Sequence, residues 1–340
     1  MTASAFRRVA IPSVTAMPPA IPAGSRMQEL SGTTMGTTWS VKFVGSAASL
    51  QTLRRMIPLA LDRVIAQMSP WEDQSDVSRF NRLPLNQWQE LPRELGRVMA
   101  SALRIAEESG GAYDPTVGAL VDLWGFGPSG PRETPPPPDE IARLHQACGW
   151  RQLDLCAEAR RLRRRNYASI DLCGIAKGFA VDLVAETLLE LGIHHALVEI
   201  GGELRGCGVK PDGNPWWVGI DRPVHLSASP TPEPILVALH DLAIATSGCE
   251  RGFTRGARRF SHTIDPRTGS PVANGMITAT VLHRSCMEAD AYATALMVLG
   301  PNAATEFAVR HQLAALIRFT GNDGDSIAER ITPALDAMLA

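Results

Sequence analysis

The sequence predicts an α+β protein, a single large domain in which helices and strands are mixed. The chain has 340 residues, of which 45% are hydrophobic and only 6% aromatic, so it can bury one sizeable core. Helical and strand-like hydrophobic periods alternate along the chain without an internal repeat. We therefore expect one domain over residues 28–325, with a flexible leader at 1–27 and a tail at 326–340.

Strand and helix patterns follow one another in the first half of the chain. TTWSVKFVG (37–45) alternates apolar and polar residues, as a strand does. Residues 50–68 carry an apolar stripe at helical spacing, and a second helix over 93–109 ends at a glycine pair. Four consecutive prolines fit neither a helix nor a central strand, so 127–139 is predicted as a surface loop rather than a domain linker. A short helix over 139–148 and a strand near 167–172 are expected next.

The second half continues the same alternation. Apolar residues from Phe179 to Leu191 recur at spacings of three and four, which predicts a helix that Gly192 ends. ALVEIGGEL (196–204) is predicted to be a buried strand ended by a glycine pair. Further strands are expected at 215–220, 235–239, 243–248 and 277–283, and the final helices at 287–299 and 301–311.

Charge and motif content exclude several classes of protein. Lys plus Arg (33) nearly balances Asp plus Glu (35), which argues against a nucleic-acid partner. No apolar run approaches the ~20 residues of a membrane span. The 6 cysteines include no C-x-x-C pair, so we expect buried free thiols rather than a zinc site or a disulfide framework. The motifs of serine hydrolases, P-loop NTPases, Rossmann dehydrogenases and zincins are also missing.

The first residues resemble a signal peptide only in part. Arg7 and Arg8 could form its basic region, but prolines at 12, 18, 19 and 22 interrupt the apolar stretch that must follow. No cysteine follows that could accept a lipid. We therefore expect a chain of this sequence to stay in the cytoplasm.

A possible anion site lies in DLCGIAKG (171–178), where the long helix is predicted to begin. Free backbone N–H groups and the positive end of the helix dipole favour a phosphate there, and Lys177 adds a charge. Gly174 and Gly178 would let a ligand approach the backbone. The ordinary alternative is a strand-to-helix turn with a surface lysine.

Oxygen ligands for a metal occur in EADAYATALMVLG (288–300). Asp290 and Thr294 are four residues apart, so they share one face of a helix. A carboxylate and a hydroxyl suit Mg²⁺ that keeps water and substrate phosphate in its shell. The alternative is an aspartate near a helix start and a threonine bonded to its own helix.

Other polar or aromatic clusters surround these two. His262, in RRFSHTIDPRTGSPV (258–272), is the best of the 8 histidines as a general base, although a lone histidine is usually structural. Tyr113 and Asp114 lie among glycines in GGAYDPTVGALVDLWGFG (110–127). Trp71 follows the first long helix, in MSPWEDQSDVSRFN (68–81), and could stack on a flat heterocycle or belong to the core.

Taken in order, these segments resemble the ApbE family of FAD:protein FMN transferases. The resemblance covers about residues 28–320 and rests on TTMGTTW, MSPWEDQSDVSRFN, GAYDPTVGALVDLWGFG, DLCGIAKGFAVD, LVEIGGEL, SHTIDPRTGSPV and EADAYATALMVLG. It implies a T-fold-like domain and a Mg²⁺-dependent enzyme that splits FAD. The FMN half passes to a threonine of a target flavoprotein through a phosphoester bond, and AMP is released.

The resemblance also implies roles for individual residues. Asp290 and Thr294 match the side-chain metal ligands, the carbonyl of Gly174 matches a main-chain ligand, and His262 matches the group that takes the threonine proton. The residues that match flavin-nucleotide contacts are Met35, Trp71, Ala112, Tyr113, Asp114, Asp171, Lys177 and Thr263.

The sequence departs from the family pattern at a few positions. Trp71 replaces a common tyrosine, Glu203 replaces a frequent aspartate after the glycine pair, and Ala293 replaces a carboxylate that some members carry. Many relatives are exported, so the resemblance favours the periplasm, whereas the leader sequence favours the cytoplasm. Two other functions compete with FMN transfer: an FAD pyrophosphatase that uses water in place of threonine, and a non-catalytic FAD carrier or iron–sulfur assembly factor.

Overall fold

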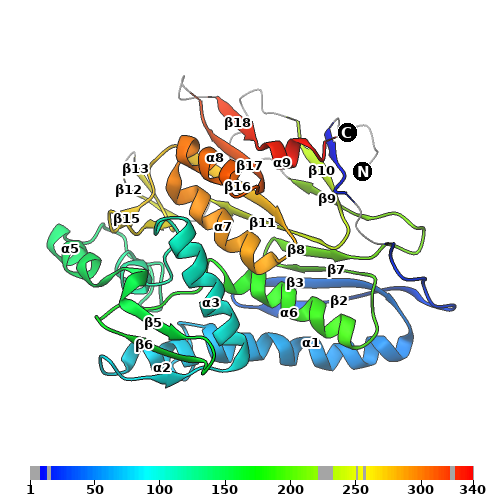
Figure 1. Ribbon diagram of the computed structural model, residues 1–340, viewed down its shortest axis with the longest axis horizontal. Helices are drawn as coiled ribbons and strands as arrows, with labels where there is room; N and C mark the ends of the chain where they lie inside the picture. Colours follow the sequence, from blue (N-terminus) through cyan, green and yellow to red (C-terminus); the bar gives the residue numbers. More distant parts are fainter. Residues whose placement is uncertain are drawn as a thin grey trace.

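An eight-stranded antiparallel sheet forms the centre of this computed structural model, which describes residues 8–13, 17–220, 233–249, 252–255, 258–321 and 326–339 (Figure 1). Its strand order is β18-β17-β16-β11-β8-β7-β3-β2, and each neighbouring pair is antiparallel. The strands are β2 (Arg26–Thr34), β3 (Thr37–Gly45), β7 (Ala196–Ile200), β8 (Glu203–Cys207), β11 (Leu242–Gly248), β16 (Met276–His283), β17 (Ala314–Thr320) and β18 (Ile327–Ile331).

Helices cover one face of this sheet. The two that matter for the site are α6 (Ala176–Glu190), which packs on β7 and β8, and α7 (Cys286–Leu299), which packs on β11 and β16. These two helices also pack against each other, and α1 (Ala47–Met68) lies on α6 (Figure 1). Both α6 and α7 are apolar on almost every side because they are enclosed between the sheet and other helices.

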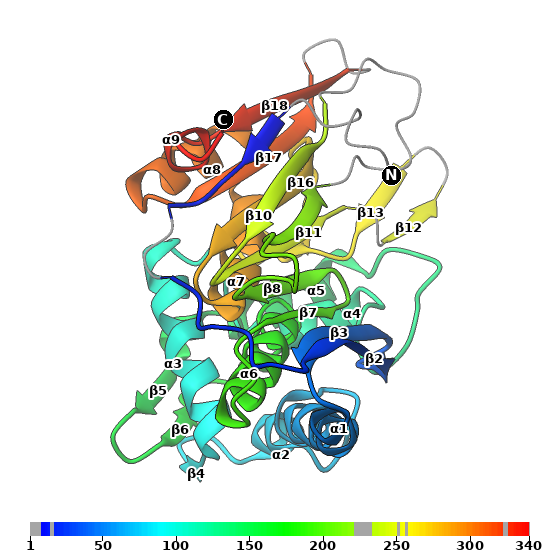
Figure 2. The same cartoon turned by 90° about the vertical axis from the view of Figure 1, so that its right-hand side faces the viewer.

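A smaller sheet lies on the opposite face (Figure 2). It has the order β1-β10-β9, with β1 (Arg8–Ala10), β10 (Ile235–Leu239) and β9 (Trp216–Ile220). Side chains of the central strands alternate between the two faces: Ala243 and Ala245 join the core under the helices, whereas Ile244 joins the core under the small sheet. The site therefore lies on the helical side, and the small sheet supports the other side.

The remaining elements surround this framework. The other helices are α2 (Asp76–Arg82), α3 (Arg93–Glu108), α4 (Gly118–Leu123), α5 (Pro138–Ala147), the 3₁₀ turn η2 (Trp150–Gln152), α8 (Pro301–Arg310) and α9 (Pro333–Asp336). The short strands are β4 (Gln89–Glu90), β5 (Leu153–Cys156), β6 (Arg161–Arg164), β12 (Gly252–Arg255), β13 (Arg258–Ser261), β14 (Ile264–Asp265) and β15 (Ser270–Pro271). In the described ranges, no helix combines the length and apolarity needed to cross a membrane.

The α+β class is confirmed, and so are the long helices and most predicted strands. The strand predicted near 167–172 is wrong, because only Ser169 makes an isolated bridge, to Val117. The hairpin of β5 and β6 precedes it instead. The glycine pair after β7 is a two-residue turn that leads directly into β8, so the segment 196–204 belongs to two strands rather than one.

The predicted leader and tail take part in the fold. Residues 8–10 form β1 in parallel with β10, and Ala10 is fully buried. Ile11 N donates a 2.7 Å hydrogen bond to the carbonyl of Met338. In the predicted tail, β18 completes the large sheet and Leu335 is buried. A flexible leader over all of 1–27 and a tail outside the domain at 326–340 are thus wrong, because both segments bury apolar side chains.

An ion-pair group joins these two ends of the chain. The Glu329 carboxylate accepts from Arg8 and, at 3.1 Å, from Nε of Arg318, whose side chain is 3% exposed. We expect Glu329→Gln to lower the free energy of unfolding by about 3–5 kcal/mol, because it removes the charge of one partner in a buried ion pair and leaves the other charge uncompensated. Urea unfolding measures this. The exposed pair of Glu186 with Arg97 gives the control, since Glu186→Gln should cost less than ~1 kcal/mol; equal losses would contradict the prediction.

Candidate functional site

The candidate site begins where α6 touches α7. The amide of Gly178 donates a 3.0 Å hydrogen bond to Oδ2 of Asp290. A Cβ on Gly178 would collide with the carbonyl oxygen of Cys286 and would lie 2.9 Å from Cβ of Asp290. Only glycine therefore allows the two helices to approach this closely.

Three elements meet one turn before Gly178, at the loop that leads into α6. A Cβ added to Gly174 would lie 3.0 Å from Oγ1 of Thr294, so the loop before α6 faces the same side of α7 as Asp290. Oγ of Ser247, at the end of β11, lies 3.2 Å from the same Thr294 oxygen. Ser247 was not predicted as a site residue. The sequence feature that could have indicated it is a pair of polar residues at the end of an apolar strand.

Lys177 and Glu203 form an ion pair beside this contact. Glu203 is 2% exposed, and its Oε2 atom has no hydrogen-bond partner among the described residues. It follows the turn of Gly201 and Gly202, where φ is 62° and 100°, as a two-residue hairpin requires. A Cβ on Gly201 would lie 2.9 Å from Thr37 and 3.5 Å from Lys177, so the turn between β2 and β3 adjoins the ion pair.

The predicted free amides of the segment 171–178 are mostly occupied. Cys173 N donates to Asp171, Gly178 N donates to Asp290, and the amides of Ile175 and Ala176 donate to the carbonyl of Leu172. The expectation of a row of open N–H groups is therefore wrong for these four amides. The positive end of the α6 dipole and the ammonium group of Lys177 remain.

Carboxyl groups outnumber ammonium groups in this part of the site. Burial raises the pKa of Asp290 and of Asp171. Burial, followed by the charge of Asp290, raises the pKa of Glu203 to about 7, and Lys177 opposes the shift. Lys177 also opposes the shift of Asp290. Two buried carboxylates therefore share one ammonium group, an arrangement that a bound cation would balance.

The loop at 112–114 adds an aromatic group. Tyr113 is 4% exposed, and its hydroxyl has no partner in the part of the chain that the structure describes. Burial, with the charges of Asp290, Asp171 and Asp114, raises the pKa of this hydroxyl well above its ordinary value. Ala112 is buried beside it. An unpartnered buried hydroxyl next to carboxylates is a plain candidate for ligand binding.

Asp114 accepts several hydrogen bonds within the described structure. Its Oδ1 accepts from the amide and the hydroxyl of Thr116, at 2.8 and 2.6 Å. Its Oδ2 accepts from the amide of Trp150 at 2.9 Å. Burial raises the pKa of Asp114, and these donors oppose the shift. The carboxylate therefore shapes the loop that carries Tyr113.

Two further flavin candidates lie at turns. Met35 has φ of 48° in the two-residue turn between β2 and β3, next to a hollow of about 510 Å³ lined by residues 33–38. Trp71 lies in the turn after α1 and is 54% exposed, so its ring is accessible for stacking. Asn81, which was not predicted, exchanges hydrogen bonds of 2.9 and 2.8 Å with the backbone of Ile170. It ties α2 to the loop before α6.

His262 and Thr263 belong to a second group. They follow β13, and the ring of His262 meets Phe126 edge-on at 6.4 Å between centroids. The amide of Thr263 donates to Oγ of Ser261 at 3.2 Å. Trp124, near the end of α4, holds the next turn through a 2.9 Å bond from Nε1 to the carbonyl of Gly269. A small aromatic core thus supports the loop that carries His262.

A divalent cation fits the first group by its chemistry. The described residues contain no cluster of three or more His, Cys, Asp or Glu side chains of the kind that holds a metal by itself. The predicted ligand set is different: one carboxylate, one hydroxyl and one carbonyl, from Asp290, Thr294 and Gly174. Such hard oxygen ligands suit Mg²⁺ that completes its shell with water and phosphate.

Comparisons with known proteins identify the family of the chain. Residues 35–317 match the sequence profile of the ApbE family. The chain is 38% identical over 299 residues to the FAD:protein FMN transferase of Vibrio cholerae serotype O1, covering 87% of this chain and 88% of the relative. It is 34% identical over 308 residues to that of Haemophilus influenzae, covering 88% of each. The structure of the Pseudomonas stutzeri flavinyl transferase ApbE, apo form, superposes with a TM-score of 0.84 at 34% identity, covering 92% of this chain and 97% of that one. The structure of the flavin transferase ApbE from Vibrio cholerae superposes with a TM-score of 0.84 at 35% identity, covering 92% of this chain and 99% of that one.

Proposed function

The chain belongs to the ApbE family and is a transferase, and from this premise we propose that it is a Mg²⁺-dependent FAD:protein FMN transferase that modifies a threonine. One observation carries the proposal. The first turn of α6, with Lys177, faces Asp290 and Thr294 on α7 across a contact that only Gly178 allows. Phosphoryl transfer needs this combination of a positive binding group and hard oxygen ligands.

The FAD diphosphate would bind at the start of α6. Lys177 offers its ammonium group, and the helix dipole adds a favourable field at the same end. Glu203 holds the Lys177 side chain in place. The flavin ring would stack on Trp71 or Tyr113. The other proposed nucleotide contacts are Met35, Ala112, Asp114, Asp171 and Thr263.

Mg²⁺ would be held by Asp290, Thr294 and the carbonyl of Gly174. When bound, the cation neutralises the charge that develops on a breaking diphosphate. Ser247 orients the Thr294 hydroxyl through their 3.2 Å contact. Burial of Asp290 keeps bulk water away from the carboxylate, so its charge would be directed at the bound cation.

His262 would activate the acceptor. Its imidazole takes the proton of the threonine hydroxyl as the threonine oxygen bonds to the phosphorus of the FMN half. The bond between that phosphorus and the bridging oxygen breaks, and AMP leaves with the oxygen. Positioning of the two reactants supplies much of the remaining acceleration.

The Lys177 side chain is expected to contribute strongly to FAD binding. Loss of a charge-assisted contact costs roughly 1.5–3 kcal/mol, so Lys177→Ala should raise the Kd for FAD by ~10-fold to ~150-fold. Fluorescence titration of the flavin measures this. Lys210, whose described ion pair is with Asp212, serves as the control, and Lys210→Ala should leave the Kd unchanged. Equal affinities for the two variants would remove Lys177 from the site.

Intact-mass analysis tests the proposed activity directly. The protein is incubated with FAD, Mg²⁺ and a flavoprotein that carries a candidate threonine. Transfer adds FMN less one water to the acceptor and releases one AMP. Free FMN with AMP and an unmodified acceptor would indicate the pyrophosphatase, and intact FAD would indicate the carrier. A threonine-to-valine acceptor is the control.

A further inference from the structure

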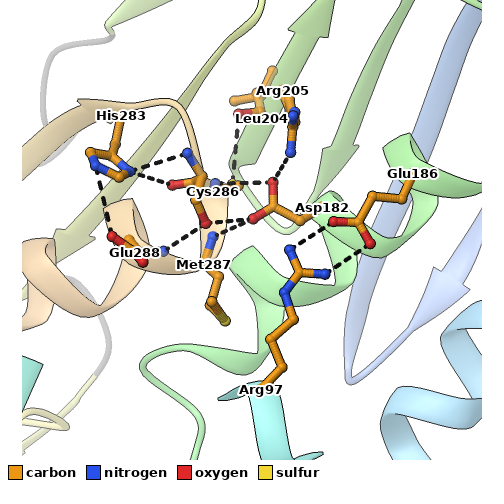
Figure 3. Close-up of polar contacts among 10 residues, drawn as sticks. Arg97, Asp182, Glu186, Leu204, Arg205, His283, Cys286, Met287 and Glu288 are labelled. Atoms are coloured by element: carbon orange, nitrogen blue, oxygen red, sulfur yellow. Dashed lines mark hydrogen bonds and ion pairs between the residues drawn. The ribbon is translucent and has the colours of Figure 1, made fainter. Parts of the chain in front are cut away.

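Asp182 is a fully buried carboxylate on α6 that binds the first turn of α7 (Figure 3). Its Oδ1 accepts from the amide of Cys286 at 3.1 Å. Its Oδ2 accepts from the hydroxyl of Ser285 at 2.8 Å and from the amide of Met287 at 3.0 Å. The amides at a helix start have no partner inside their own helix. Asp182 supplies that partner from a neighbouring helix.

Arg205 on β8 completes the group. It donates to Oδ1 of Asp182 at 2.5 Å, and its side chain is 20% exposed. The carboxylate thus meets a guanidinium group on one side and three α7 donors on the other, which compensates the cost of burying it. A sheet strand and two helices are therefore fixed at one point.

The start of α7 does not need Asp182 in order to be helical. Ser285 is the N-cap of α7, and its Oγ accepts from the amide of Glu288 at 3.3 Å. This local cap already stabilises the first turn. The contact with Asp182 has a different effect: it fixes the position of α7 relative to α6.

The position of α7 decides where its functional side chains point. Asp182 lies one turn after Gly178 on the same face of α6, and the α7 residues that they bind are also one turn apart, near Cys286 and at Asp290. A slip of α7 by one residue would rotate Asp290 by ~100° about the helix axis, away from α6. The two contacts together fix both the height and the rotation of α7.

We propose that Asp182 is a positioning residue for the transfer reaction, which holds Asp290 and Thr294 against the start of α6. This inference rests on the proposed function, because it takes those two side chains as cation ligands. Asp182 itself acts through α7. Its removal should weaken cation binding more than it weakens FAD binding.

Asp182→Asn tests this, since it keeps the size and removes the charge and one acceptor. Electron paramagnetic resonance measures the binding of Mn²⁺ to the protein in the presence of FAD. The Mn²⁺ affinity should fall by ~10-fold to ~100-fold, the usual effect of losing a group that supports a metal ligand. The Kd for FAD without metal should stay within about twofold, a change of less than ~0.5 kcal/mol. The amides of Cys286 and Met287 should exchange hydrogen faster.

Two control variants separate positioning from stability. Glu186→Gln changes the next turn of α6, where Glu186 pairs with Arg97, and should leave Mn²⁺ binding unchanged. Leu188→Ala opens a cavity in the core of α6 and should lower the melting temperature while Mn²⁺ binding stays near wild type. If the role of Asp182 were purely structural, Mn²⁺ affinity would fall together with the melting temperature, in Leu188→Ala as well as in Asp182→Asn.

The outcomes are distinct. Wild-type Mn²⁺ affinity in folded Asp182→Asn overturns the inference. If that variant does not fold, Ser285→Ala removes one of the donors, and it should weaken Mn²⁺ binding in the same direction; an unchanged affinity overturns the inference. If the wild type binds no Mn²⁺ and transfers FMN without a cation, the proposed metal role fails. The amide exchange of Cys286 and Met287 in Asp182→Asn then still decides whether the anchor exists.

Discussion

Replacing Asp290 with alanine is expected to abolish FMN transfer while the protein remains folded. The carboxylate is 3% exposed and is the acidic member of the proposed ligand set. A bound cation contributes several kcal/mol to a phosphoryl-transfer transition state, so the rate should fall by ~10³-fold or more. Burial raises the pKa of Asp290, which means that burial opposes its charge in the cation-free chain. Its removal should therefore cost little stability.

Transfer rates with Mg²⁺ and circular dichroism melting check this prediction. Glu288 provides a matched control on the same helix, because it pairs with Arg104 and is not a proposed ligand. Glu288→Gln should retain most of the activity. A wild-type rate for Asp290→Ala, or full wild-type activity in EDTA, would contradict the metal role.

Replacing His262 with alanine is expected to slow transfer by ~10²–10⁴-fold, the usual contribution of a general base. A threonine hydroxyl keeps its proton at neutral pH, so it is a poor nucleophile without an acceptor for that proton. FAD and cation binding should be nearly unchanged, since neither is assigned to the imidazole. The defect should shrink as pH rises, because hydroxide can then replace the missing base.

Single-turnover rates between pH 6 and 9 give the test. His194 is exposed and lies on the loop before β7, so His194→Ala is the matched control and should transfer at the wild-type rate. Equal rates for His262→Ala and wild type at neutral pH would make another group the base. A loss that appears in FAD affinity alone would assign His262 to binding.

The sequence predicts the helices well because their signal is local. Residues 50–68 carry an apolar stripe and apolar residues recur at helical spacings after Phe179, and the structure has α1 and α6 there. The strand prediction near 167–172 also rests on a local pattern, yet that segment has no strand partner beyond one bridge at Ser169. Whether an extended segment becomes a strand depends on a neighbour, and a local pattern does not contain that information.

The candidate site divides in the same way. Asp290 and Thr294 share a helix face, so their spacing alone predicts that they act together. The contact of Gly178 with Asp290 joins distant parts of the chain, and no local pattern marks it. Ser247 reaches Thr294 only because β11 lies beside α7. The motif of Asp114 is clear, but no local pattern marks the hydrogen bond that its Oδ2 accepts from the distant amide of Trp150.

The pairing of the two chain ends has a consequence for synthesis. Residues 8–10 leave the ribosome well before their partners, which are β10 and, at Ala10, Leu339. At ~5–20 residues per second, this strand waits on the order of tens of seconds for its neighbours. We expect proteolysis of ribosome-stalled chains cut short before β10 to remove these first residues, and protection there would contradict the idea. The pairing of β1 is thus completed only after β10 has been made.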